Sequence, residues 1–238
     1  QDEKVRIIDC PFKFKSVGFL KKYAFSFATG DILLETDHDD LLIPSALEEL
    51  NKAFQDSEIG FVYSNNAKLA DNFVPYNACN GWEFRNFEYL GKNLIEMVSF
   101  EPSAASMAFI WYAPDHLRAW RASVYKELGG HDENMSILDD QDLLIRTYLA
   151  TKMKFIDKCL YLYRIHDENT WLDRNSQIQI ETVRMYHKYA YQLAEREADL
   201  NGLSKIDLGG GFNSPAGYRS IDLQNADIIT DLTEKWPL

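Results

Sequence analysis

One stretch of the sequence decides the fold class: residues 32–64, which read ILLETDHDDLLIPSALEELNKAFQDSEIGFVYS. Ile32–Glu35 is predicted to form a short buried strand, and Pro44 suits the first turn of a helix. Apolar residues follow the proline at spacings of three and four, at Leu47, Leu50 and Phe54. Gly60–Ser64 then predicts the next strand. Strand, helix and strand in this order are typical of an α/β unit with parallel pairing.

The sequence on both sides of this stretch continues the alternation of strands and helices. The further elements that we expect are a strand at 5–10, helices at 18–29, 117–128 and 143–151, a strand at 155–164, a long helix from Asp173 or Asn175 to Asn201, and a strand at 205–208. Residues 70–110 are aromatic and irregular and give no assignment. The expected organisation is one domain at 1–172, a linking helix at 173–202 and the start of a second α/β module at 203–238.

Composition excludes several classes of protein. The 238 residues are 46% hydrophobic and 26% charged, which suits a globular core and excludes intrinsic disorder. The longest apolar run, Met107–Ala113, is far shorter than the ~20 residues of a membrane span. Twenty-five basic and 37 acidic residues give a net charge of −12, which disfavours nucleic-acid binding but allows a small phosphorylated ligand bridged by a cation.

The cysteines favour a reducing compartment. There are three, Cys10, Cys79 and Cys159, and their odd number and wide spacing fit neither a disulfide framework nor a zinc site. We expect all three to be small buried apolar side chains. A cytoplasmic location is therefore the expectation.

An acidic cluster follows the predicted strand at 32–35. Asp37, Asp39 and Asp40 place three carboxylates within four residues. The carboxyl end of a strand in an open α/β sheet is where ligands usually bind, and Mg²⁺ or Mn²⁺ prefers oxygen ligands. The alternative is a solvated loop in which Asp40 caps the helix that begins near Pro44.

Two further clusters strengthen the interpretation as a site. Gly129–Leu143 reads GGHDENMSILDDQDL and carries several carboxylates, and Tyr163–His166 ends the strand predicted at 155–164. Together, these groups are what a metal-assisted group transfer requires. One carboxylate holds the metal, another accepts a proton from an attacking hydroxyl, and a histidine completes the metal shell.

The three clusters resemble, in the same order, the motifs of family-2 glycosyltransferases of the GT-A fold. Asp31–Leu41 (DILLETDHDDL) resembles the Asp-X-Asp segment, Gly129–Leu143 the glycine-glycine-aromatic-Asp-Glu stretch followed by Glu/Asp-Asp, and Tyr163–Thr170 (YRIHDENT) the Tyr-Arg-X-His element. The resemblance covers about residues 5–172. It implies a GT-A-like, Rossmann-like mixed α/β sheet flanked by helices.

The resemblance also implies roles for the donor side of the site. Asp39 would be the direct metal ligand, Asp37 would lie nearer the nucleotide ribose, and His166 would be a further metal ligand or a diphosphate contact. Lys22, with Lys21, could face the diphosphate, although a solvated helix face is the favoured interpretation of both lysines. His38 and His131 are expected to be non-ligands in neighbouring loops.

On the acceptor side, the resemblance implies that Asp140 is the general base, with Asp139 beside it as the second candidate. Four residues precede the base motif where the family lines its acceptor pocket: His116, Arg118, Trp120 and Arg121. The alternative for these four is a set of ordinary residues on a helix surface.

One part of the family pattern is missing. Family members begin with a strand, a turn and a second strand whose acidic end holds the nucleotide base, and nothing of this kind precedes Val5. The sequence thus predicts a GT-A sheet without its first strands, a fragment with an incomplete donor pocket. The open sheet edge would allow pairing with a second copy, as in a homodimer.

The C-terminal tail differs in composition from the rest of the chain, with three consecutive glycines at 209–211. Lys205–Leu223 (KIDLGGGFNSPAGYRSIDL) places a glycine-rich turn between two strand patterns, which argues against a flexible linker. It resembles the opening of a class I S-adenosylmethionine-dependent methyltransferase. In a complete parent, the resemblance implies that S-adenosylmethionine would contact Asp207, Gly209, Gly211, Asp222 and Asp231. Only about 35 residues of that fold are present, too few for a core, so this part should not methylate anything by itself.

The function expected from the motifs is transfer of a sugar from a nucleotide-diphosphate-sugar donor to a hydroxyl of a glycan or similar acceptor. A bacterial or phage-type enzyme of this kind would use Mn²⁺ or Mg²⁺ and invert the anomeric carbon. Two alternatives remain open at this point. The front part could only bind sugar for a methyltransferase, or the chain could be a non-catalytic interaction domain with structural acidic clusters.

Overall fold

The computed structural model describes residues 4–13, 15–70, 74–75, 83–110, 113–166, 170–231 and 233. The chain divides into two compact units, Gln1–Tyr189 and Ala190–Leu238. The division falls inside the long helix α6 (Thr170–Asn201), where the sequence predicted a helix. In the described residues, no helix is both long enough and apolar enough to cross a membrane.

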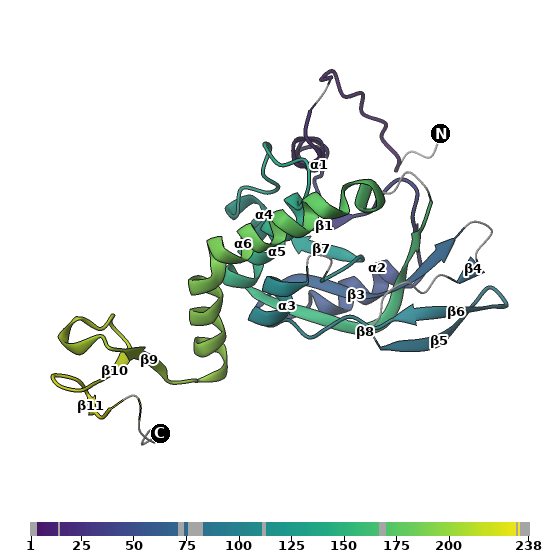
Figure 1. The fold of residues 1–238 in the computed structure, drawn as a ribbon. Coiled ribbons are helices and arrows are strands. Elements are labelled where there is room, and N and C mark those ends of the chain that lie inside the picture. The colour runs from purple at the N-terminus through teal and green to yellow at the C-terminus, as the bar shows by residue number, and fades with distance from the viewer. Residues whose placement is uncertain are drawn as a thin grey trace. The chain divides into compact units, whose positions relative to one another are not determined.

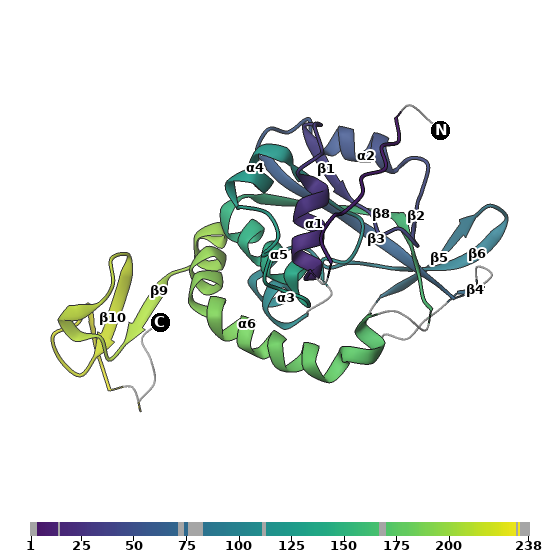
Figure 2. The ribbon, with the colours of Figure 1, turned by 90° about the horizontal axis from the view of Figure 1, so that it is seen from above.

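Unit 1 is built on a mixed sheet with β3 (Ile59–Ala70) at its centre. Along its main path the sheet runs β1 (Ile32–Glu35), β7 (Arg118–Arg121), β3, β6 (Lys92–Met97) and β5 (Phe84–Tyr89). The long strand β8 (Lys152–Arg164) pairs with β3 in parallel and carries β2 (Leu41–Leu42), while β4 (Val74–Pro75) pairs with β3. Figure 1 shows β3 and β8 side by side, and the β5–β6 hairpin extends beyond them in both Figures 1 and 2.

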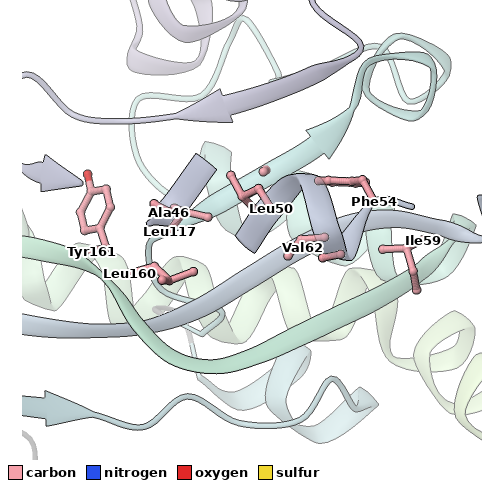
Figure 3. Packing of buried hydrophobic residues seen from close by; sticks show 10 residues of the cluster. Ala46, Leu50, Phe54, Ile59, Val62, Leu117, Leu160 and Tyr161 are labelled. Carbon is pink, nitrogen blue, oxygen red and sulfur yellow. The ribbon is translucent and has the colours of Figure 1, made fainter. Parts of the chain in front are cut away.

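Helices cover both faces of this sheet, which confirms the α/β class with a mixed sheet flanked by helices. The helices of unit 1 are α1 (Val17–Phe25), α2 (Ala46–Ala53), α3 (Ala104–Phe109), α4 (Ala122–Glu127), α5 (Asp139–Ala150) and the first part of α6. On one face, Leu50 of α2 and the following Phe54 belong to one buried cluster with Ile59, Val62 and Leu160 of the sheet (Figure 3). The alternate residues of the strands, Phe61 and Trp120, face the opposite side, where the Trp120 indole N–H donates to Thr147 Oγ1 of α5 at 3.0 Å.

Several predicted elements are confirmed, and two are wrong. Residues 32–35, 46–53 and 152–164 form the expected strand, helix and strand, with β8 three residues longer at its start than predicted. The described residues 4–13, in contrast, form no strand, and Val5 and Ile7 are exposed because no neighbouring strand pairs with them. The helix predicted at 117–128 is wrong in its first half. Residues 118–121 form β7, whose extended state is fixed by pairing with β1 and β3 on its two sides.

The predicted strand–helix–strand unit forms, but its two strands are not neighbours. β1 and β3 both run antiparallel to β7, which lies between them, so they point in the same direction without pairing. The parallel partner of β3 is β8. The apolar pattern of a buried strand does not show which strand pairs with it. The position of β7 between β1 and β3 therefore could not be predicted from residues 32–64.

Unit 2 contains a three-stranded parallel sheet. Its strands are β9 (Lys205–Leu208), β10 (Tyr218–Asp222) and β11 (Ile228–Ile229), in the order β11-β10-β9, with a short 3₁₀ turn at Gly211–Asn213. The expected strand at 205–208 is confirmed. Within this unit, Lys205 Nζ lies 2.7 Å from Asp199 Oδ1, at the end of α6.

The cysteines divide between surface and core. Cys159 is buried in β8, as predicted, in a cluster with Leu69 and Leu94. Cys10 is exposed, so its predicted burial is wrong, because the segment that carries it does not join the sheet. Cys79 lies outside the described residues. Both described cysteines are free thiols.

Candidate functional site

Four distant parts of the chain meet at the carboxyl end of β1. They are the loop after β1, the start of β7, the first turn of α5 and the end of β8. The register explains part of this meeting, because Glu35 at the end of β1 pairs with Arg118 at the start of β7. Tyr63 of β3 pairs with the same arginine from the other side.

Asp39 and His166 form the first pair of the site. The Nε2 atom of His166 lies 2.6 Å from Asp39 Oδ2, although 127 residues separate them. Both side chains are partly exposed, so a ligand could reach them. Burial alone would raise the pKa of Asp39, but the hydrogen bond from His166 lowers it below the usual range. Asp39 is therefore held ionised, the form that binds cations. The rest of the third motif, residues 167–169, lies outside the described residues.

Asp37 is the most open carboxylate of the loop, and its side chain faces His116. His116 Nε2 lies 3.6 Å from Asp37 Oδ2, and the imidazole stacks on the ring of Tyr161 with a centroid distance of 4.9 Å. His116 is buried, and its Nδ1 atom has no hydrogen-bond partner in the described part of the chain. Burial, followed by the nearby cation of Arg118, lowers the pKa of His116, so this histidine is neutral at pH 7.

Asp40 fastens the loop to β8 and does not cap a helix. Its Oδ2 accepts a hydrogen bond from Tyr161 Oη at 2.8 Å, and its Oδ1 accepts one from the backbone N–H of Arg164 at 2.8 Å. The N-cap of α2 is Ser45, without a side-chain hydrogen bond. The alternative in which Asp40 caps that helix is therefore wrong. Burial raises the pKa of Asp40 to about 6.

Asp140 and Arg118 form the second pair of the site. Arg118 donates to Asp140 Oδ2 at 2.7 Å, and its Nε donates to the carbonyl oxygen of Pro114 at 2.8 Å. Burial would raise the pKa of Asp140, but the cations of Arg118 and Lys21 lower it. The first turn of α5 thus presents an ionised carboxylate at the site, which the helix N-terminus also favours.

Asp139 points the other way, into the protein. It is 3% exposed, and burial together with the charge of Asp140 raises the pKa of Asp139 to about 6. Its Oδ2 atom lies 3.9 Å from Nε2 of His131. Of the two candidate bases, Asp140 is the one with a partly exposed carboxylate.

A largely buried charged group lies behind the site and was not expected from the sequence; its members are Lys21, Glu35 and His131. Lys21 Nζ lies 2.5 Å from Glu35 Oε1, so the expectation of a solvated face is wrong for this lysine. Burial opposes ionisation of Glu35, but Lys21 holds the pKa of Glu35 well below its usual value. His131 lies in the loop after α4, as expected, and is completely buried. One feature of the sequence could have indicated this group: Glu35 is a charged residue in a strand predicted to be buried, next to the acidic cluster.

Three of the predicted binding residues lie elsewhere. Trp120 is 0% exposed in the core, and Arg121 donates to the carbonyl oxygens of Phe54, Asp56 and Ile59 at the other end of β7. Lys22 remains on the surface, 3.3 Å from Glu133 Oε1. The alternative of an exposed helix surface for residues 116–121 is wrong, because they are mostly buried and 118–121 form a strand. The structure brings His116 and Arg118 to the site.

In unit 2, the glycine-rich turn lies beside two of the predicted carboxylates. Asp207 Oδ2 accepts a hydrogen bond from Ser214 Oγ at 2.9 Å, and a Cβ atom on Gly211 would lie 3.7 Å from Asp222 Oδ2. Gly209 and Gly211 have positive φ angles of 77° and 52°, which favour glycine. Asp231 follows β11 and accepts from Thr233. Asp207, the turn and Asp222 therefore gather at the ends of β9 and β10.

The donor set of unit 1 suits a cation that shares its ligands with a substrate. Among the described residues, no group of three or more His, Cys, Asp or Glu side chains is arranged to enclose a metal ion. Asp39 and His166 supply two adjacent ligand atoms, and Asp37 belongs to the same loop. Mg²⁺ and Mn²⁺ commonly take one or two protein ligands and complete their shell with phosphate oxygens and water. The residues present fit that arrangement.

The raised pKa of Asp40 predicts a pH-dependent cost in stability. Between about pH 4 and about pH 6 the unfolded chain releases this proton while the folded chain keeps it, so the free energy of unfolding falls as the pH rises. Asp40→Asn removes this cost and can keep the contacts to Tyr161 and Arg164. Relative to the unsubstituted chain, the variant should gain about 2 kcal/mol between pH 4 and pH 7.

Urea denaturation at the two pH values measures this difference. Asp31→Asn is the matched control, because Asp31 is exposed at the opposite end of β1 and should show the same offset at both pH values. A constant offset for Asp40→Asn would contradict the prediction.

Comparisons with known proteins found matches among solved structures alone. No protein-family model matches the chain, and no curated protein sequence matches it. Among solved structures, the chain is similar to S. aureus TarS 1–349, with a TM-score of 0.46 and 12% identity over 84% of this chain and 56% of that one. For the TarS complex with UDP-GlcNAc, the TM-score is 0.45 and the identity 12%, over 84% of this chain and 57% of that one. For the complex with UDP, the TM-score is 0.42 and the identity 12%, over 82% of this chain and 54% of that one. The chain thus spans a little over half the length of these structures.

Proposed function

We propose that this chain is the catalytic region of a glycosyltransferase that moves a sugar from a nucleotide-diphosphate-sugar donor to a hydroxyl group. One observation carries the proposal. The residues that resemble the family's three motifs lie far apart in sequence, yet they meet at one edge of the sheet as two pairs. Asp39 contacts His166 at 2.6 Å, and Asp140 is held by Arg118 at 2.7 Å. A cation-binding pair and a separate ionised carboxylate are the two parts that the reaction needs.

On the donor side, Asp39 and His166 would hold Mn²⁺ or Mg²⁺ together with the diphosphate, and Asp37 would lie next to the ribose. The cation, when bound, neutralises charge that develops on the departing diphosphate. Neutral His116 faces Asp37 and keeps the loop close to β8 through its stacking on Tyr161.

On the acceptor side, Asp140 would take the proton from the attacking hydroxyl. The hydroxyl oxygen forms a bond to the anomeric carbon while the bond from that carbon to the diphosphate oxygen breaks, and the proton moves to the Asp140 carboxylate. A single in-line displacement of this kind inverts the anomeric centre. Arg118 keeps Asp140 ionised and oriented beforehand. The acceptor class remains a hydroxyl of a glycan or similar molecule.

Unit 2 favours a second, separate proposal for a longer parent protein. Its parallel strands, glycine-rich turn and the carboxylates of Asp207 and Asp222 support an S-adenosylmethionine site of the class I methyltransferase type. The supporting observation is that the glycine-rich turn lies against both carboxylates: a Cβ atom on Gly210 would collide with Asp207 Oδ2, and one on Gly211 would lie 3.7 Å from Asp222 Oδ2. Binding of S-adenosylmethionine by the parent, and its loss in Asp222→Ala, would test this.

Thermal melting tests the donor site directly. The chain is heated with and without Mn²⁺ in the presence of UDP, GDP or dTDP, with and without their sugars. We expect stabilisation by one nucleotide, only with Mn²⁺, of about 2.7 kcal/mol at a ligand concentration 100 times Kd. Asp39→Asn should abolish this stabilisation because it removes one ligand charge, and the control Asp31→Asn should keep it.

The same samples are assayed for release of the nucleoside diphosphate. Release of one nucleotide in the presence of Mn²⁺ would support a transferase. Stabilisation without release would favour a binding domain. Neither stabilisation nor release with any donor would favour the reading of the acidic clusters as purely structural.

A further inference from the structure

Three buried polar atoms from three elements face one another behind the site. They are Glu35 Oε2 at the end of β1, His131 Nε2 after α4, and Asp139 Oδ2 at the start of α5. The residues are 5%, 0% and 3% exposed. The Nε2 atom lies 3.4 Å from Glu35 Oε2 and 3.9 Å from Asp139 Oδ2. Within the described part of the chain, none of the three atoms has a hydrogen-bond partner. Unpaired polar atoms at this depth are costly, so the group calls for an explanation.

The surroundings of the imidazole fix which nitrogen carries a proton toward the carboxylates. His131 Nδ1 lies 2.9 Å from Tyr125 Oη, which can donate to it. Nε2 faces two carboxylate oxygens, and a bare nitrogen lone pair there would repel both. An Nε2–H group can donate to Glu35 Oε2 at 3.4 Å, while Asp139 Oδ2, at 3.9 Å, is attracted to it electrostatically. The ring itself is held in place by stacking on Phe25, at a centroid distance of 5.7 Å.

The two carboxylates belong to opposite halves of the proposed site. Glu35 lies two residues before Asp37, on the strand that carries the cation-binding loop. Asp139 directly precedes Asp140, the proposed base. Each half also has its own ion pair with a basic side chain, since Lys21 contacts Glu35 and Arg118 contacts Asp140. His131 therefore connects two elements whose spacing decides how far the cation lies from the base.

We propose that His131 is a positioning residue, whose Nε2–H donates to Glu35 and faces Asp139, and that this bridge between the two carboxylates sets the distance between the cation-binding loop and the base Asp140. This inference rests on the proposed function. A residue that only filled the core between Phe25, Trp120 and Tyr125 would need no nitrogen at this position. Phenylalanine would fill the same space without burying polar atoms.

Kinetics of three variants separate positioning from packing. His131→Phe keeps the ring and loses the donor, His131→Gln returns a donor near the Nε2 position, and His131→Asn returns one on the Nδ1 side. We expect His131→Phe to lower kcat for sugar transfer about 10- to 100-fold, with the donor KM changed less than about threefold. His131→Gln should recover most of this loss, and His131→Asn should not.

The matched control is His187→Phe, the same substitution at an exposed histidine of α6, which should leave kcat unchanged. Melting temperatures with and without Mn²⁺ and nucleotide show whether each variant is folded. A wild-type kcat in a folded His131→Phe variant, or equal recovery by Gln and Asn, would overturn the proposal.

A spectroscopic arm keeps this inference separate from the proposed function. In protein with ¹⁵N-labelled histidine, assigned by its loss in His131→Phe, NMR should show a protonated Nε2 whose hydrogen exchanges slowly with water. Its resonance should move in Asp139→Asn and stay in place in Asp31→Asn. If the chain transfers no sugar but this signature is present, the bridge stands and the proposed reaction fails. An unprotonated or rapidly exchanging Nε2 overturns the bridge whatever the activity.

Discussion

Replacing Asp140 with asparagine should lower the rate of sugar transfer about 10²- to 10⁴-fold. The amide cannot take a proton from the acceptor hydroxyl, although its oxygen can still accept the hydrogen bond from Arg118. Mn²⁺-dependent binding of the nucleotide should persist, because Asp39 and His166, the pair proposed to hold the cation, are unchanged. The measurement is release of the nucleoside diphosphate at saturating donor, with nucleotide binding followed by thermal melting on the same samples.

The neighbouring carboxylate provides the comparison for this result. Asp139→Asn leaves the Asp140–Arg118 pair in place, so it should retain far more activity than Asp140→Asn. Asp31→Asn should behave as the unsubstituted chain. Because Asp140→Asn leaves the buried charge of Arg118 without its partner, some loss of stability is expected, and the assay must run below the melting temperature of the variant. Equal transfer rates for Asp140→Asn and the unsubstituted chain would show that Asp140 is not the base.

Replacing Trp120 with alanine should cost about 3–5 kcal/mol in the free energy of unfolding. The indole is 0% exposed at the centre of the sheet, where it packs on Phe61 with a centroid distance of 4.8 Å. It also donates to Thr147 Oγ1 of α5, and the deletion leaves that buried oxygen short of a donor. Urea denaturation measures the loss as a lower midpoint with an unchanged slope.

Two milder substitutions divide this loss into its parts. Trp120→Phe keeps most of the ring contacts and removes the N–H, while Thr147→Val removes the acceptor and should cost about 1 kcal/mol. The same variants test the expectation that Trp120 lines an acceptor pocket. If it did, Trp120→Phe would raise the KM for the acceptor at nearly unchanged stability. A loss in stability below about 1 kcal/mol for Trp120→Ala would contradict the core position.

The sequence predicts best where local pattern and final environment agree. β1, α2 and β8 follow from short apolar runs, a proline and apolar residues at helical spacing, so neighbours in sequence carry the signal. β7 could not be predicted in this way. Its residues 118–121 contain two arginines and a tryptophan, and they become a strand only because β1 and β3 flank them. Residues 5–10 are the opposite case. Their composition favours a strand, but no described strand pairs with them and they remain exposed.

The same distinction applies to the site. Asp37, Asp39, Asp140 and His166 could be chosen because each belongs to a recognisable motif, and their order along the chain resembles that of a family. The connection among Glu35, His131 and Asp139 could not be chosen, because it consists of distances between side chains on three elements. Trp120 and Arg121 were chosen for their position in the sequence. In the structure, Trp120 is buried in the core, and Arg121 lies at the end of β7 away from the site.

The pairing of β3 with β8 has a consequence for how the chain is made. The two longest strands of unit 1 lie side by side, yet β3 ends at Ala70 and β8 begins only at Lys152. At a synthesis rate of about 5–20 residues per second, β3 therefore waits on the order of several seconds for its main partner. Contacts of such long sequence separation also slow folding after release. During that interval the apolar residues Phe61, Val62 and Leu69 are uncovered, so β3 is the segment of the nascent protein that a chaperone would shield.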